Sequence, residues 1–232
     1  MKMFPKVITG AIGLAGALAI STLTTQAQNL LVDGSFENGT FTGNPIGLSG
    51  PGYVDQGWAN NFGGATPTQS SAYAESGTYS LLTYNAQFNN WNPVGTYQVV
   101  DGLNVGQPIT VAQQYSLSVY AMAPTALSGT YGTPIDIQLQ FFNAALGNVQ
   151  TTETGWSALG AIGTWQKYTV TGIAPAGAVY AAPYLMFMDN GQTTTDNVYF
   201  DNAVLVAVPE PATIALLGMG LALPLYLIRR RK

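Results

Sequence analysis

Residues 135–141 read Ile-Asp-Ile-Gln-Leu-Gln-Phe, and this stretch decides the fold class of the chain. Apolar and polar side chains alternate along it with a period of two, which is the pattern of a strand with one buried and one exposed face. The segment that begins at Tyr115, Tyr-Ser-Leu-Ser-Val-Tyr-Ala-Met, shows the same alternation. Both stretches therefore predict half-buried β-strands.

Further candidate strands occur along the chain, separated by clusters of Gly, Pro and Asn that favour turns. They cover residues 80–84, 96–100, 166–171, 184–188 and 198–206, with one more strand expected near Trp58. No helix longer than a turn or two is expected in this part of the chain. Many short strands with turns between them predict an all-β domain, either a β-sandwich or a jelly roll, over residues 28–207.

The predicted domain is acidic and otherwise poor in charge. It has ten carboxylates and a single base, Lys167, which gives a net charge of −9. We exclude nucleic acid as a partner, because no basic surface is available to neutralise phosphates. The chain has no Cys and no His, which removes disulfides, the usual Ser-His-Asp and Cys-His catalytic groups and the commonest zinc ligand.

The N-terminal residues, 1–27, have the pattern of a signal peptide. A basic start precedes an apolar stretch rich in small side chains, residues 7–23, and Thr-Gln-Ala at 25–27 resembles a small-x-Ala cleavage site. We therefore predict cleavage between Ala27 and Gln28. A retained membrane helix is the alternative, but the cleavage-like site and the polar sequence that follow favour removal.

The C-terminal residues, 208–232, form a second targeting segment. Pro209, Glu210 and Pro211 lead into an uncharged stretch, residues 212–228, and Arg-Arg-Arg-Lys ends the chain. At about 1.5 Å per residue this stretch reaches roughly 26 Å, which is marginal for a hydrocarbon core of about 30 Å. It predicts a short transmembrane helix whose basic end stays cytoplasmic, with the domain on the outer side. An ordinary C-terminal anchor is one interpretation.

Taken in order, the signal peptide, Val-Pro-Glu-Pro at residues 208–211, the short apolar helix and the basic tail resemble the PEP-CTERM sorting class of exported proteins in Gram-negative bacteria. The resemblance implies export followed by recognition by an exosortase, a membrane-embedded cysteine protease, which would cut near Pro209 to Pro211. The protein would be anchored in the membrane before processing and then pass to the cell surface or extracellular matrix. The triplet is also interpretable as a stiff linker, since two prolines hinder continued secondary structure.

The domain resembles a second family, the galactose-binding-like jelly rolls, which include several carbohydrate-binding modules. The matching segments, in order, are Asn-Leu-Leu-Val-Asp-Gly-Ser-Phe-Glu-Asn-Gly at 29–39, Trp58, Glu-Ser-Gly-Thr-Tyr-Ser-Leu at 75–81, Tyr-Ser-Leu-Ser at 115–118, Gly-Thr-Trp-Gln-Lys-Tyr at 163–168 and Val-Tyr-Phe-Asp-Asn-Ala-Val-Leu at 198–205. The resemblance implies a jelly-roll β-sandwich in which Trp58 packs in the core.

In that family a structural calcium ion commonly ties the first strand to the last. The positions that match here are Asp33, Glu37, Ser76 and Asp201, and these residue types have the oxygen atoms that calcium requires. The alternative is that Asp33 and Asp201 are turn or bulge residues whose side chains are satisfied locally.

Three aromatic residues in polar loops, Trp91, Tyr131 and Trp156, are candidate ligand contacts. Neutral sugars stack on flat rings, while Asn, Gln and Asp bind their hydroxyl groups. Each ring is equally interpretable as folded back over the core. A glycosidase would need two carboxylates about 5 to 10 Å apart, and nothing in the sequence marks such a pair.

We therefore expect an exported, non-catalytic β-sandwich that is sorted through its tail and binds polysaccharide. A purely structural matrix or adhesion protein without a defined ligand is the second hypothesis, and a glycoside hydrolase or lyase is the third. A concave face that carries aromatic side chains would favour the first, a flat polar face without them the second, and two facing carboxylates in a cleft the third.

Overall fold

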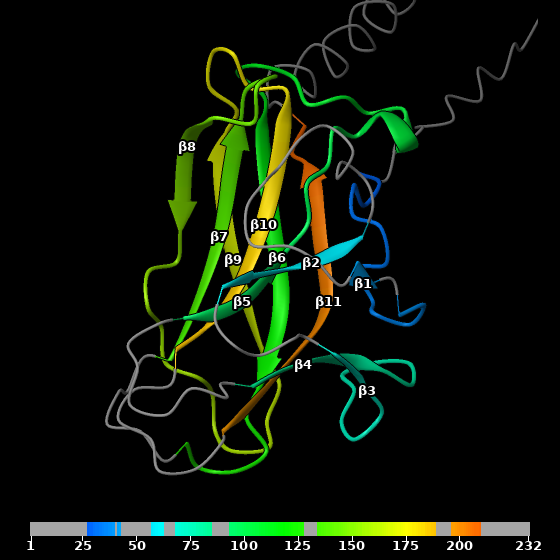
Figure 1. Ribbon diagram of the computed structural model, residues 1–232, viewed down its shortest axis with the longest axis vertical. Coiled ribbons are helices and arrows are strands. Elements are labelled where there is room, and N and C mark those ends of the chain that lie inside the picture. The colour runs from blue at the N-terminus through cyan, green and yellow to red at the C-terminus, as the bar shows by residue number, and fades with distance from the viewer. Residues whose placement is uncertain are drawn as a thin grey trace, which may run out of the picture.

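The computed structural model describes residues 27–39, 41–42, 57–62, 68–84, 93–127, 134–188 and 196–209. These residues form two β-sheets that lie face to face (Figure 1). The first sheet has six strands, in the order β1(Phe41–Thr42), β2(Trp58–Phe62), β5(Val94–Tyr97), β10(Tyr180–Phe187), β7(Ile135–Phe142) and β8(Asn148–Glu153). The second has five, in the order β3(Thr68–Ser70), β4(Ser80–Tyr84), β11(Asn197–Ala207), β6(Gln114–Met122) and β9(Gln166–Ile173).

This architecture confirms the predicted all-β jelly-roll sandwich. The one helical element among the described residues is a single 3₁₀ turn, η2(Leu103–Val105). No helix within the described ranges is long and apolar enough to cross a membrane. The predicted span at 212–228 lies outside the described residues, and so does the signal peptide up to residue 26.

The core between the sheets follows from the alternation noted in the sequence. Every second residue of β7 is fully buried in it, namely Ile135, Ile137, Leu139 and Phe141. From the opposite sheet, β6 buries Tyr115, Leu117, Val119 and Ala121 in the same cluster. Period-two alternation therefore marks the inward faces of both sheets correctly.

β10 begins at Tyr180, four residues before the predicted start at residue 184, and it therefore contains Pro183. Pro183 has no N–H to offer Gln98, although its carbonyl accepts the Gln98 N–H at 3.3 Å. The ladder with β5 therefore ends at Tyr97 and resumes as a bridge between Val100 and Ala181, with both N···O distances at 2.9 Å.

The first described segment, residues 27–39, lies alongside β11. The Asn29 side chain accepts the Leu205 N–H at 2.9 Å and donates to the Ala203 carbonyl at 3.0 Å. The Leu30 N–H donates to the Leu205 carbonyl at 2.8 Å. These bonds hold the beginning and the end of the described chain against each other, where Figure 1 shows the blue segment next to the arrowhead of β11.

Trp58 confirms the core role implied by the resemblance. Its side chain is fully buried, and its ring centroid lies 5.1 Å from that of Phe36. Its Nε1–H donates to the Asp33 carbonyl at 3.0 Å. The indole therefore links β2 to the first segment through both packing and a hydrogen bond.

Candidate functional site

The outer face of the six-stranded sheet, which points away from the second sheet, carries one row of side chains across five strands. Its members are direct register partners on β2, β5, β10, β7 and β8 in turn: Ala59, Tyr97, Tyr184, Gln138 and Glu153. Residues directly opposite one another in neighbouring strands share a face of the sheet. The row therefore runs from apolar at β2 through aromatic at β5 and β10 to polar at β7 and β8.

The aromatic part of this face is a stacked tyrosine pair. The rings of Tyr97 and Tyr184 lie 5.1 Å apart with an interplanar angle of 13°. Burial, and secondarily the neighbouring Tyr97 hydroxyl, raise the pKa of Tyr184, so its hydroxyl stays protonated at neutral pH. The pair belongs to a second apolar cluster whose other buried members are Ala59, Val99, Phe142, Ala182 and Met186.

The polar part is a chain of hydrogen-bonded side chains along β7 and β8, which we call the amide ladder: Asp136, Gln138, Gln140, Asn148 and Glu153. Gln138 Nε2 donates to Asp136 Oδ2 at 2.8 Å and to Glu153 Oε2 at 2.9 Å. Gln140 Nε2 donates to Gln138 Oε1 at 2.7 Å. Asn148 Nδ2 donates to Gln140 Oε1 at 2.6 Å. The amides are thus held in fixed orientations before any ligand arrives.

The amide ladder is accessible from solvent at several points. Asn148 and Glu153 are exposed, and Gln138 and Gln140 are half-buried. From Asp136 to Phe142 the strand extends about 20 Å at roughly 3.4 Å per residue. The ladder is therefore long enough to lie along a chain of several sugar units.

Trp156, a predicted ligand contact, joins this face. It is half-buried and packs against the second apolar cluster, as Tyr180 and Leu146 do. The neighbouring Ser157 bridges to Ile135 at the start of β7, whereas Tyr180 is the register partner of Phe142 at its end. The amide ladder therefore has an aromatic side chain near each end. The other two predicted contacts, Trp91 and Tyr131, lie outside the described residues.

The sequence did not single out the amides or the tyrosine pair. The sequence showed Asp136, Gln138 and Gln140 as the polar side of a strand. It did not show that a tyrosine pair from two other strands lies on the same face of the sheet. That depends on the strand order.

Three of the four residues predicted to bind calcium, Glu37, Ser76 and Asp201, come together at one loop, residues 75–79. Asp201 Oδ2 accepts the N–H groups of Glu75 at 2.8 Å and Ser76 at 3.2 Å, and its Oδ1 accepts the Asn202 N–H at 2.6 Å. Asp201 is fully buried and stands at the bulge between β11 and β6. Burial raises the pKa of Asp201, and the N–H donors offset part of that rise.

Glu37 holds the other end of the same loop. Its Oε1 accepts the N–H groups of Thr78 and Tyr79, both at 2.9 Å. Gly77 lies between the two anchored ends with φ +69°, and a Cβ there would stand 2.3 Å from Glu37 Oε1. The positive φ therefore favours glycine at this position, and a side chain there would displace the Glu37 carboxylate from the loop. We call Glu37, Asp201 and the 75–79 loop the carboxylate clasp.

Calcium would need six to eight oxygen ligands at the clasp. Three of the carboxylate oxygens there, Asp201 Oδ1, Asp201 Oδ2 and Glu37 Oε1, accept N–H groups. Asp33 has a left-handed φ of 50° and its Oδ1 accepts the Asn38 N–H at 3.1 Å, as expected of a turn residue. No group of three or more acidic side chains in the described part of the chain could hold a metal ion. Calcium here stays a prediction.

We expect a chelator to leave the melting temperature of the protein unchanged, because N–H groups of the loop already hold the carboxylates of Glu37 and Asp201 in place. Differential scanning calorimetry with EDTA, and again with excess calcium, would measure this. Free calcium at a hundred times its Kd would add about 2.7 kcal/mol to the free energy of unfolding and raise the melting temperature by roughly 5–10 °C. A shift of that size, reversed by calcium, would show that the ion is structural.

Comparison with known proteins gives a motif and a fold. Residues 207–232 match the PEP-CTERM protein-sorting motif. No curated protein matches the chain.

Among solved structures, the enzymatically active domain of tailspike protein 4 from bacteriophage CBA120 aligns with a TM-score of 0.52 at 12% identity, covering 78% of this chain and 21% of the tailspike chain. The chain thus spans about a fifth of that structure. The Stig cyclase Fisc from Fischerella sp. TAU aligns with a TM-score of 0.52 at 16% identity, covering 79% of this chain and 99% of the cyclase.

The C-terminal family 22 carbohydrate-binding module of Clostridium thermocellum Xyn10B aligns with a TM-score of 0.47 at 21% identity, covering 66% of this chain and 88% of the module. At such identities these likenesses concern the fold alone. The chain therefore carries a PEP-CTERM protein-sorting motif at its C-terminus, behind a jelly-roll body.

Proposed function

We propose that this is an exported protein, sorted by an exosortase through its C-terminal motif, whose β-sandwich binds a neutral polysaccharide without catalysis. The observation that carries the proposal for the body is the amide ladder with aromatic side chains near both ends. Calcium plays no part in this proposal.

The chemistry of the ladder suits hydroxyl groups. Gln138 and Asn148 each donate both of their N–H groups within the protein, so their carbonyl oxygens would accept from sugar hydroxyls. Gln140 Nε2 donates one N–H to Gln138 and keeps the other for a hydroxyl oxygen. Because Gln138, Gln140 and Asn148 are already oriented by one another, binding would cost little side-chain entropy. Trp156 and Tyr180 would supply flat apolar surfaces for the ring faces of the sugar. Trp91 and Tyr131, which lie outside the described residues, stay proposed as further contacts.

The charge of the body selects the class of polysaccharide. A net charge of −9 repels polyanions, and the outer face presents amides and hydroxyls rather than Lys or Arg. A neutral glycan is therefore the ligand that fits both the local chemistry and the overall field.

The two competing hypotheses fit this face less well. A purely structural matrix protein was expected to show a flat polar face without aromatic side chains, whereas Trp156 and Tyr180 lie on this one. A hydrolase needs two carboxylates that reach the substrate. Asp136 and Glu153 both bind Gln138, but Asp136 is only 2% exposed, so a glycosidic bond would not reach its carboxyl group.

The sorting part of the proposal rests on the matched motif. The exosortase would cut near Pro209, Glu210 and Pro211, of which only Pro209 lies in the described part of the chain. Before cutting, the chain would be held in the membrane by residues 212–228. After cutting, the body would belong to the cell surface or the extracellular matrix.

The Gln138→Ala variant should bind a neutral polysaccharide about tenfold more weakly than the wild type, since a tenfold change corresponds to about 1.4 kcal/mol, the strength of one or two hydrogen bonds. Trp156→Ala should weaken binding similarly. Affinity electrophoresis on glucans, mannans and galactans, with alginate as an anionic comparison, would measure both.

Gln166→Ala is the matched control, because Gln166 is an exposed glutamine on β9 of the other sheet. It should bind as the wild type does. Failure of the wild type to bind any neutral glycan would favour the purely structural hypothesis, and release of reducing ends during incubation would favour a hydrolase.

A further inference from the structure

One end of the sandwich exposes four large aliphatic side chains. Their exposed fractions are 64% for Leu103, 47% for Val111, 55% for Ile173 and 38% for Val179. The loop before β6 and the end of β9 lie side by side there, because the Ala112 N–H donates to the Ala174 carbonyl at 2.8 Å. We call this surface, made by residues 101–113 and 173–179, the tail-proximal pole.

The C-terminal motif begins at this pole. The Val208 N–H donates to the Gln114 carbonyl at 2.8 Å, and Gln113 Nε2 donates to the Val208 carbonyl. Gln114 is also the register partner of Ile173. A cavity of about 270 Å³ there is lined by Ala27, Gln107, Gln113, Ala207 and Pro209. Both ends of the described chain therefore lie beside the exposed aliphatic side chains.

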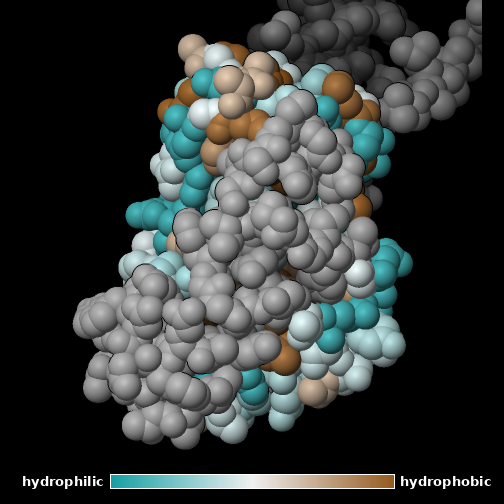
Figure 2. Space-filling model, viewed as in Figure 1, coloured by the Kyte–Doolittle hydropathy of each residue, from teal (hydrophilic) through white to brown (hydrophobic). Residues whose placement is uncertain are grey.

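The pole is nearly free of charge although the domain is acidic. Residues 101–113, 142–149, 173–181 and 203–209 contain one charged residue, Asp101. Its Oδ1 accepts the Leu103 N–H at 2.7 Å. Figure 2 shows hydrophobic residues gathered at the upper end of the molecule, above the more hydrophilic flanks.

We infer that the tail-proximal pole rests on the phospholipid surface while the tail is inserted. This inference rests on the membrane-held stage of the proposed function. Pro209 and the start of the apolar stretch at residue 212 are three residues apart, at most about 10 Å of extended chain. The pole is therefore held within reach of the lipid headgroups, where burial of aliphatic side chains is favourable.

Electrostatics favours the same orientation. Anionic lipids repel an acidic protein within about a Debye length, and the nearly uncharged pole is the part of this domain that they repel least. The amide ladder then points outward from the membrane: its Phe142 end lies near the pole, since the Val179 N–H donates to the Phe142 carbonyl at 2.9 Å. The Trp156 end lies farther away.

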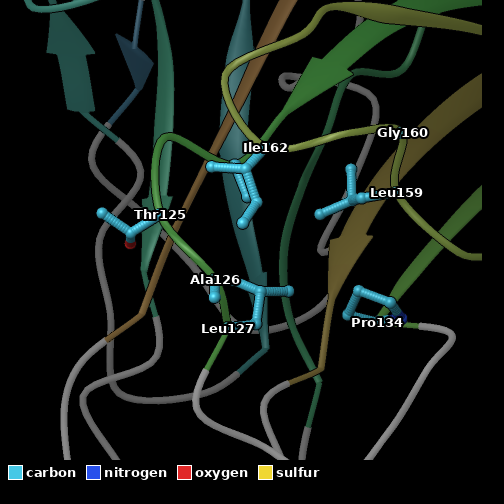
Figure 3. A pocket seen from close by; sticks show the side chains of 8 residues that line it. Thr125, Ala126, Leu127, Pro134, Leu159, Gly160 and Ile162 are labelled. Carbon is cyan, nitrogen blue, oxygen red and sulfur yellow. The ribbon is translucent and has the colours of Figure 1, made fainter.

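The opposite end of the sandwich supplies a matched control site. A hollow of about 170 Å³ lies where β6 ends and β7 begins. Figure 3 shows Leu127, Pro134, Leu159 and Ile162 around it. Ile162 is 61% exposed, which closely matches Leu103 at the pole.

The absence of cysteine from the chain allows single labels. The full-length variants Leu103→Cys, Val111→Cys and Ile162→Cys would each be coupled to an environment-sensitive fluorophore and reconstituted into phosphatidylcholine vesicles that contain a headgroup-nitroxide lipid. We expect labels at positions 103 and 111 to show blue-shifted emission and to lose intensity by nitroxide quenching. The label at 162 should show neither change.

Each other outcome overturns the inference in a distinct way. If the chain floats with the vesicles but labels at 103 and 111 behave like the label at 162, the pole does not touch lipid and the anchor stands. If the chain does not float with the vesicles, the membrane-held stage of the proposed function fails as well. If the blue shift occurs without vesicles and light scattering gives the mass of a dimer, a second copy covers the pole.

Discussion

The Trp58→Ala variant should lose about 3–5 kcal/mol of its free energy of unfolding, the range found when a large buried aromatic side chain is removed. Trp58 is fully buried and packs against Phe36, so alanine would leave a cavity between β2 and the first segment. The Asp33 carbonyl would also lose the indole N–H that it accepts. Urea denaturation followed by circular dichroism would measure the change.

Two controls separate packing from hydrogen bonding. Trp58→Phe keeps much of the ring volume and removes the N–H donor, so its loss should be close to 1 kcal/mol for the hydrogen bond plus a smaller packing term. Trp156→Ala removes the same side chain from a half-buried site and should cost clearly less than Trp58→Ala. Equal losses of unfolding free energy for Trp58→Ala and Trp156→Ala would contradict the conclusion that Trp58 stabilises the fold by packing in the core.

The Asp201→Ala variant should lose about 3 kcal/mol, because three backbone N–H groups lose their acceptor and each hydrogen bond contributes about 1 kcal/mol. The groups belong to Glu75, Ser76 and Asn202. Asp101→Ala is the control, since the half-buried Asp101 accepts a single N–H, that of Leu103, and its loss should stay near 1 kcal/mol. Similar losses in the two variants would argue against the clasp.

The pH dependence of the Asp201 contribution has a defined sign. Burial raises the pKa of Asp201 above its ordinary value of 3.8, so the folded protein holds this proton more tightly than the unfolded chain does. Between 3.8 and the higher folded pKa, the free energy of unfolding contributed by this group therefore increases as the pH falls.

Comparison with Asp201→Asn isolates this titration. The wild type should gain stability relative to Asp201→Asn when the pH is lowered from 7 to about 4, as measured by urea denaturation at each pH. A cation bound to the carboxylate would lower its pKa and reverse the sign. A relative loss of wild-type stability on acidification would therefore support the calcium site.

The strands that the sequence predicted well have one face in the core between the sheets. Residues 80–84 were predicted with the bounds that β4 has, and residues 135–141 differ from β7 by one residue. β8 was missed because it is an edge strand with a mostly exposed surface, so its sequence, Asn-Val-Gln-Thr-Thr-Glu, shows little apolar periodicity. β3 was missed for the same reason, at three residues in length.

The candidate sites depend on contacts between segments that are distant in the sequence. The resemblance named Glu37, Ser76 and Asp201 together, and the structure places them at one loop where the carboxylates accept N–H groups; their binding of calcium stays a prediction. The amide ladder and the tyrosine pair depend on the order β5-β10-β7-β8, which places residues 97 and 184 next to each other. Local patterns contain no information about which strands become neighbours.

The position of β11 bears on how the protein would carry mechanical load. The motif follows β11 directly, and β11 is paired with β4 on one side and β6 on the other. Ladder hydrogen bonds run perpendicular to a strand, so tension applied through the tail along β11 would load both ladders in shear, with many bonds sharing the force. The domain would therefore resist unfolding when it is pulled through its tail, because the hydrogen bonds of β11 would have to break together and not one after another.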